Sequence, residues 1–167
     1  MRPCWLAVPA LLILTGCDLV DPVVVYRQAA QQLRFTLERV EPSIQVAFPP
    51  DRSHLGLRLT LGVDNPTSVR FKARGITGQI FLDAEGASRG IGQLDFAHGV
   101  DLAPGARTPL TVDLTFTYGE LKDAWGSLRA VVLNTRPGTW RLDGQVSMEA
   151  MGIPITVPLR SRKTVNQ

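Results

Sequence analysis

Cysteine and histidine are scarce in this chain, and their scarcity excludes several kinds of site. The 167 residues include two cysteines, Cys4 and Cys17, and two histidines, His54 and His98. Because residues 18–167 contain no cysteine, that part of the chain has no internal disulfide and no cysteine-based metal or redox site. Its stability must therefore come from packing.

One histidine has acidic neighbours, but this group falls short of a metal site. Asp95, His98 and Asp101 are close together in the sequence. Two carboxylates and one imidazole on a loop lack the ligand set and the defined geometry that are typical of zinc sites. We therefore expect a solvated loop and no bound metal there.

The excess of positive charge is also small. Lys and Arg together number 18 and Asp and Glu 15, so the formal net charge is +3. Three surplus charges spread along the chain are too few for a stripe that follows phosphates, and we expect no nucleic acid partner. Hydrophobic residues make up 44% of the sequence and charged residues 20%, which fits one ordinary globular domain and excludes gross disorder.

Motifs for catalysis or nucleotide binding are lacking as well. A serine hydrolase needs a serine in a strained, glycine-flanked turn, whereas Gly-Ser occurs only at Gly126-Ser127, inside a predicted helix. The segments Gly75–Gly78 and Gly90–Gly92 lack the following helix and the lysine of a phosphate loop, and such glycines are typical of bulges in β proteins. We expect no enzyme activity, no catalytic residue, no cofactor and no small-molecule substrate.

An apolar run occurs at the N-terminus, where it follows the positive Met1-Arg2. Residues 4–14 are almost wholly apolar. This run is about half the roughly 20 residues that a membrane-spanning helix needs, and Pro9 interrupts it. The pattern predicts a secretory signal peptide over residues 1–16.

The end of this segment resembles the lipobox of bacterial lipoproteins. Leu14, Thr15, Gly16 and Cys17 provide an aliphatic residue, two small residues and a cysteine. The resemblance implies cleavage before Cys17 and attachment of a diacylglyceryl group to its thiol, with fatty acids such as palmitate. Two acyl chains hold a protein stably to a bilayer, whereas one does so only marginally. The alternative is a free cysteine at the end of an apolar N-terminal helix.

On this interpretation the chain lies in the bacterial cell envelope, faces the periplasm and is anchored to a membrane through Cys17. Asp18 resembles the signal that retains lipoproteins in the inner membrane of enteric bacteria, which favours the inner over the outer membrane. Residues 17–32 would hold the anchor and a tether. Asp21-Pro22 fits the start of a helix, but the run Val23–Val25 favours a strand equally well.

From residue 33 onward, apolar residues alternate with polar ones in segments bounded by turn residues. The clearest segment spans residues 55–63, where Leu and Val occupy the odd positions. Further segments have apolar residues at Ile44, Val46 and Phe48; Val69, Phe71 and Ala73; Ile76, Ile80 and Leu82; Leu94 and Phe96; Leu110, Val112, Leu114 and Phe116; Trp140, Leu142, Val146 and Met148; and Ile153, Ile155, Val157 and Leu159. Seven or eight strands with one face to bury predict an all-β, antiparallel sandwich.

Two local irregularities are also predicted. Apolar residues fall on odd numbers up to Leu37 and on even numbers from Val40, so a bulge or strand break is expected between Glu38 and Pro42. Thr117–Glu120 fits a capping box. Leu121, Trp125, Leu128 and Val132 follow it at helical spacing. They predict one inserted amphipathic helix that ends near Asn134 and covers the sandwich core.

Several segments together carry a family resemblance. They are residues 55–86 (LGLRLTLGVDNPTSVRFKARGITGQIFLDAEG), RGIGQL, APGARTPLTVDLTF, WRLDGQVSM and IPITVPL. This chain is similar over about Leu55 to Arg160 to the group-2 late embryogenesis abundant proteins, whose module is also called the water-stress and hypersensitive-response domain. The most specific piece is the strand that ends in Asn65-Pro66. Pro66 cannot donate to a β-ladder and Asn65 can bond nearby backbone, so the pair ends a strand and starts a loop.

The resemblance implies an immunoglobulin-like or fibronectin type III-like sandwich, here over residues 33–160, and a role without catalysis. We expect a monomer that acts in envelope or desiccation stress through contact with proteins or lipids. Residues 161–167 are expected to form a basic tail. Its charges, with Arg160, could lie against anionic headgroups, although a solvated tail is the simpler expectation.

Two other functions remain open. The domain could be a binding module that docks a specific envelope protein through a sheet edge or through the helix at 118–132. It could also carry a small apolar ligand, which would require a deep pocket between the sheets with converging polar groups.

Overall fold

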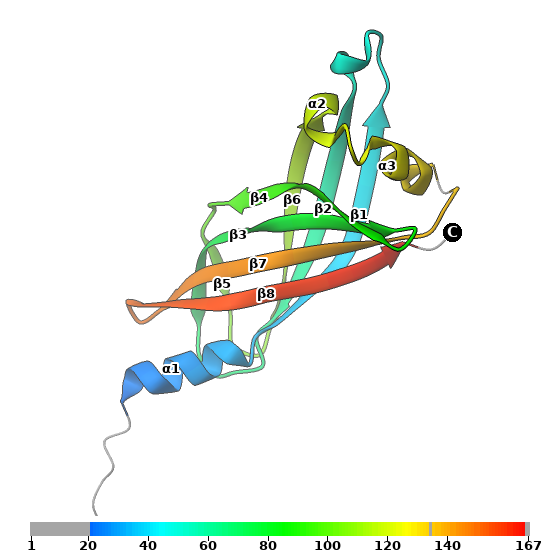
Figure 1. Ribbon diagram of the computed structural model, residues 1–167. Helices are drawn as coiled ribbons and strands as arrows, with labels where there is room; N and C mark the ends of the chain where they lie inside the picture. The colour runs from blue at the N-terminus through cyan, green and yellow to red at the C-terminus, as the bar shows by residue number, and fades with distance from the viewer. Residues whose placement is uncertain (1–20, 134, 166–167) are drawn as a thin grey trace, which may run out of the picture.

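Eight strands form two antiparallel sheets that share one hydrophobic core (Figure 1). The computed structural model describes residues 21–133 and 135–165. The predicted all-β sandwich of about eight strands is confirmed. The predicted signal peptide and the lipobox residues lie outside the described residues, and these are Leu14, Thr15, Gly16 and Cys17, with Asp18 after them.

Each sheet has two open edges. The first sheet has the order β1-β2-β6 and consists of β1 (Arg34–Gln45), β2 (His54–Asp64) and β6 (Arg107–Thr117). The second has the order β4-β3-β7-β8 and consists of β3 (Phe71–Ala84), β4 (Ala87–Phe96), β7 (Gly138–Ala150) and β8 (Ile153–Val165), with the short β5 (Val100–Leu102) paired to the start of β3. Strands β1 and β8 are therefore edges of different sheets.

The alternating residues of the strands build the core as the sequence predicts. In β2 the five odd-numbered apolar residues from Leu55 to Val63 are all buried. They share one core with the even-numbered apolar residues of β7, among which Trp140 and Leu142 are almost completely buried. Because successive side chains of a strand point to opposite faces, the same alternation places charged residues on the outer surfaces.

Register shifts occur near two of the positions where the alternation of apolar and polar residues is interrupted. The pairing of β1 with β2 shifts between Leu37 and Arg39, which confirms the predicted bulge. The pairing of β3 with β7 shifts between Ala73 and Gly75. The segments on either side of that shift were expected to be separate strands, but they form the single strand β3 because a bulge absorbs the extra residue without breaking the ladder.

Two strand ends differ from the sequence expectation. Strand β1 stops at Gln45, so Val46 and Phe48 do not face the core as predicted and are 72% and 91% exposed. There the chain turns through the short 3-10 helix η1 (Pro50–Arg52). Strand β8 instead continues to Val165, because the first residues of β7 supply it with a partner. Residues 161–165, expected in a basic tail, thus belong to the sheet.

Helices lie at the ends of the sandwich (Figure 1). Helix α1 (Pro22–Gln31) begins where the sequence left helix and strand open, and Asp21 caps it by accepting a hydrogen bond from the Val23 N–H at 2.9 Å. The helix expected after β6 is split into α2 (Tyr118–Leu121) and α3 (Trp125–Val132), and the predicted capping box is present. No helix in the described part is long and apolar enough to cross a membrane.

Candidate functional site

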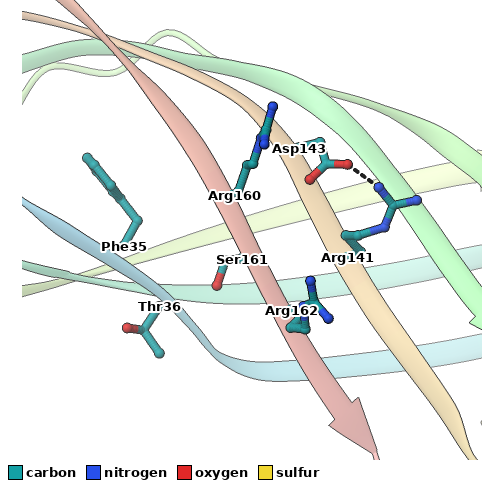
Figure 2. A pocket seen from close by; sticks show the side chains of 7 residues that line it. All are labelled: Phe35, Thr36, Arg141, Asp143, Arg160, Ser161 and Arg162. Carbon is teal, nitrogen blue, oxygen red and sulfur yellow. Dashed lines mark hydrogen bonds and ion pairs between the residues drawn. The ribbon is translucent and has the colours of Figure 1, made fainter.

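A groove of about 680 Å³ lies where the edge strands β1 and β8 of the two sheets meet (Figure 2). It is lined by Phe35, Thr36, Arg141, Asp143, Arg160, Ser161 and Arg162. Half-buried Phe35 comes from β1, and the charged residues come from β7 and β8. The groove therefore combines one apolar wall with a strongly charged one.

A hydrogen bond joins the two edges at the groove. The Leu37 N–H, just before the bulge in β1, donates to the Ser161 Oγ of β8 at 2.7 Å. Ser161 points toward β1, whereas its neighbours Arg160 and Arg162 point to the opposite side of β8 (Figure 2). Ser161 thus fixes the part of β8 that carries both arginines.

The strand register places like charges opposite each other. Arg162 pairs directly with Arg141 on β7, and Arg160 pairs with Asp143. Like charges at directly opposed positions on one face of a sheet destabilise it. The local charge balance therefore depends on which of these arginines has an acidic partner.

Arg141 is held by several contacts. Its guanidinium donates to Asp143 and, from Nε, to Asp83 Oδ2 at 3.3 Å. It also lies 4.4 Å above the ring of Phe81, a distance typical of a cation–π contact. By contrast, within residues 21–133 and 135–165 neither Arg160 nor Arg162 has an ion-pair or hydrogen-bond partner for its side chain. Two cationic groups thus remain available at this surface.

The groove continues into two adjoining hollows. One, of about 450 Å³, is lined by Leu33, Phe35, Pro158 and Arg160. The other, of about 590 Å³, is lined by Asp83, Gly86, Ala87, Ser88, Arg141 and Arg162. Each of these hollows shares an arginine of β8 with the groove, so all three lie beside Arg160 or Arg162.

This arrangement suits anion binding better than catalysis. A guanidinium presents several N–H donors that match the oxygens of phosphate or carboxylate groups. The hydroxyls of Thr36 and Ser161 are the nucleophilic groups of the groove, and neither histidine is among the residues that line it. In the described ranges, no three His, Cys, Asp or Glu side chains are grouped so that they could hold a metal ion.

A second groove, of about 640 Å³, opens between the edge strands β4 and β6 and is more apolar. Phe116 packs over Gly92, where an added Cβ would lie 2.8 Å from the ring Cδ1, so glycine is needed for this approach. Glu120 borders the groove, and hydrogen bonds from the backbone N–H and then the hydroxyl of Thr117 hold the pKa of its carboxyl below the usual value. The carboxylate of Glu120, the acidic group of this groove, is thus already hydrogen-bonded to Thr117.

Asn65 and Pro66 lie away from both grooves, directly after the end of β2. Asn65 is buried, and its Nδ2 donates to the carbonyl oxygens of Val69, Leu102 and Ala103 at 2.8, 3.1 and 3.1 Å. Its Oδ1 accepts from the Thr67 N–H at 3.1 Å. The side chain thus joins the loop before β3 to the end of β5 and the loop after it, which is a structural role.

The loop around His98 does not bring its acidic neighbours into one group. Asp95 lies on β4 and Asp101 on β5, with His98 between these strands. The imidazole ring of His98 packs against Phe96 with the ring centroids 5.2 Å apart. The aromatic contact accounts for the position of the histidine.

Sequence reasoning found only part of the arginine groove. It identified Arg160 and Arg162 as basic residues near the chain end but placed them at the start of a tail. Arg141 and Asp143 received no role. The available signal was the alternation of charged with apolar residues in β7, which places both on its outer face. The adjacency of β1 and β8, which makes the groove, has no local signature in the sequence.

Comparisons with known proteins gave distant structural likenesses. No family model matches the chain, and no curated protein matches it. A protein from Archaeoglobus fulgidus is similar at 15% identity with a TM-score of 0.46, covering 78% of this chain and 97% of its own. A protein from Arabidopsis thaliana is similar at 15% identity with a TM-score of 0.49, covering 80% of each chain. The family resemblance noted in the sequence stays a prediction.

Proposed function

We propose that this chain is a non-catalytic bacterial lipoprotein whose β-sandwich acts at the periplasmic surface of a membrane. The segment Leu14–Cys17 carries the proposal, because its residue types and its position after a short apolar run match a lipobox. The role would be protection of the envelope during water stress, through contact of the domain with proteins or lipids. This role follows from the resemblance to group-2 late embryogenesis abundant proteins.

The distance between the anchor and the domain supports this role. Helix α1 starts at Pro22, so four residues separate it from the lipid-bearing Cys17, and 22 − 17 gives five Cα–Cα steps between the anchor and the helix. An extended chain spans at most about 3.6 Å per residue, so the tether reaches about 18 Å. A domain held this closely contacts the membrane surface and whatever lies on it.

Replacement of the anchor cysteine tests the proposal. In cells fed labelled palmitate, we expect the wild-type chain to take up the label and to sediment with membranes, and Cys17→Ser to lose both properties. Cys4→Ser is the matched control, because Cys4 leaves with the signal peptide and its replacement should preserve label and sedimentation. Unchanged labelling and sedimentation of the Cys17→Ser variant would refute the proposal.

A docking module is the second candidate, and the turn between β1 and β2 favours it. Phe48 is 91% exposed there, yet the turn is well ordered by hydrogen bonds. The Ser53 Oγ accepts from the Ala47 N–H at 3.0 Å and donates to the Ala47 carbonyl at 3.3 Å. An exposed aromatic side chain on a turn whose backbone is fixed by hydrogen bonds is typical of an interface anchor.

Site-specific crosslinking in cells distinguishes the two candidates. A photoreactive residue at Phe48 should give one discrete adduct if the turn docks a specific protein, and diffuse adducts if the domain is a general protectant. The matched control is the same residue at Met151, which is similarly exposed in the β7–β8 turn. The experiment is run before and after osmotic upshift.

A further inference from the structure

We propose that the side of the domain formed by β7 and β8 lies on the bilayer, with Arg160 and Arg162 bound to the phosphate groups of anionic lipid headgroups. The inference rests on the proposed anchor at Cys17, which would hold the domain at that bilayer. It adds a defined lipid-binding surface and an orientation to the proposed function.

Unbalanced charge is the first argument. Arg141 has two carboxylates beside it, whereas Arg160 and Arg162 make no ion pair in the described part of the chain. Asp143, which is opposite Arg160 in the register, is already bonded to Arg141. The direct opposition of Arg162 and Arg141 adds a repulsion that an anion between them would remove. The groove is thus complementary to a phosphate that the protein does not itself supply.

Spacing on the strand is the second argument. Residues i and i+2 of a strand project from the same face about 6.6 Å apart. Arg160 and Arg162 can therefore contact one phosphodiester together or two neighbouring headgroups. Half-buried Phe35 also lines the groove, where it offers an apolar surface to the glycerol and upper acyl carbons of a lipid.

Position relative to the anchor is the third argument. Leu33 and Arg160 line the same hollow, and Leu33 lies two residues past the end of α1. Helix α1 packs beside β8 (Figure 1). The first turn of α1, next to the tether, exposes Val24 and Val25 by 46% and 41%. Exposed aliphatic residues beside the anchor, together with arginines on the strand that α1 contacts, are the composition expected of a surface that rests in an interface.

Fluorescence quenching on vesicles tests this orientation. The mature chain has no cysteine other than Cys17, which carries the lipid, so an introduced cysteine is a unique thiol. Thr156→Cys places a fluorophore on the outer face of β8, and Thr111→Cys places one on the exposed face of β6 in the other sheet. The intact acylated protein is reconstituted into phosphatidylcholine vesicles, with or without a third of phosphatidylglycerol, that contain a headgroup quencher.

We expect the Thr156→Cys probe to be quenched several-fold more with phosphatidylglycerol than without it, and the Thr111→Cys probe to be unaffected. The double variant Arg160→Gln/Arg162→Gln should lose this difference. The matched double variant Arg52→Gln/Arg70→Gln removes two exposed arginines elsewhere and should keep it. High salt should abolish the effect, because a Debye length of about 3 Å at 1 M screens the phosphates.

Three results would overturn the inference. These are equal quenching on both kinds of vesicle, quenching that survives the loss of Arg160 and Arg162, and equal losses in both double variants. A response of the probe to soluble glycerol phosphate without any response to vesicles would also overturn it. Flotation tests the proposed anchor separately from the quenching, because a chain without acyl groups would not float with vesicles of pure phosphatidylcholine.

Discussion

Asn65 shows how one buried side chain can hold several loops in place. Its amide group bonds three carbonyl oxygens, one from the loop before β3, one from the last residue of β5 and one from the loop after β5, and its own N–H donates to the Ala106 carbonyl at 2.9 Å. Of the standard side chains that fit this space, asparagine can donate to carbonyls and accept from the Thr67 N–H at the same time. The polar residue thus completes the backbone hydrogen bonding where β2 ends.

Removal of this amide should be costly. We expect Asn65→Ala to lower the free energy of unfolding by about 2–4 kcal/mol, because it leaves buried carbonyl groups without donors. Asn65→Asp should be no better, since it turns a carboxylate oxygen toward those carbonyls. Urea denaturation measures both variants against wild type. A loss below about 0.5 kcal/mol for Asn65→Ala would show that the loops hold without it.

Glu120 provides a test by titration. Hydrogen bonds from the backbone N–H and then the hydroxyl of Thr117 lower the pKa of the Glu120 carboxyl. We expect carbon NMR to show Glu120 titrating below a typical exposed glutamate, and Thr117→Val to raise its pKa only partly, because the backbone bond remains. Since the pKa is lower in the folded state, the stabilisation is present above the unfolded-state value of about 4.3 and is lost as the pH falls through the folded value. An unaltered Glu120 pKa in Thr117→Val would contradict the assignment.

Elements defined by local pattern were predictable, and elements defined by distant partners were not. The alternation in residues 55–63 gave β2 and its buried face, and the phase change at Glu38 gave the bulge. The sequence Arg160–Val165 has no buried apolar alternation, so it becomes a strand only because β7 lies beside it. The same dependence hid the arginine groove, since its walls come from strands more than 100 residues apart in the sequence.

The close approach of β3 and β7 depends on a pair of glycines. Gly78 and Gly144 are directly opposed in the register, and a Cβ on Gly144 would lie 2.6 Å from Gly78 Cα and in collision with the Thr77 carbonyl oxygen. We expect Gly144→Ala to destabilise the fold by roughly 1–3 kcal/mol, as overpacking does. Urea denaturation measures the change.

Gly126 in α3 provides the matched control for that prediction. A Cβ there would meet no atom within 4 Å. Alanine is favoured over glycine in helices, so Gly126→Ala should stabilise the protein by up to about 0.5–1 kcal/mol. Equal effects of the two variants would show that the Gly78–Gly144 contact does not limit the spacing of β3 and β7.

The whole molecule has two different ends. Helix α1, which follows the proposed tether, and the β1–β2 turn with η1 lie at opposite ends of the sandwich (Figure 1). If the β8 side rests on the bilayer, the β1–β2 turn lies at the end of the domain that is farther from the anchor. Contact with lipid and contact with a protein would then use separate surfaces, so the two candidate functions are compatible in one molecule.

Two phenylalanines, one buried and one exposed, allow an effect on folding stability to be distinguished from an effect on contact with a partner. Phe71 is completely buried, and Phe71→Ala should cost about 3–5 kcal/mol in a thermal or urea unfolding experiment. Phe48 is almost fully exposed, so Val46→Ser/Phe48→Ser should change the free energy of unfolding by less than about 0.5 kcal/mol. Any loss of a crosslinked partner in this double variant would then report lost contact and not lost folding. A stability loss above about 1 kcal/mol would instead mean that the turn is buried in solution, as it would be against a second copy of the chain.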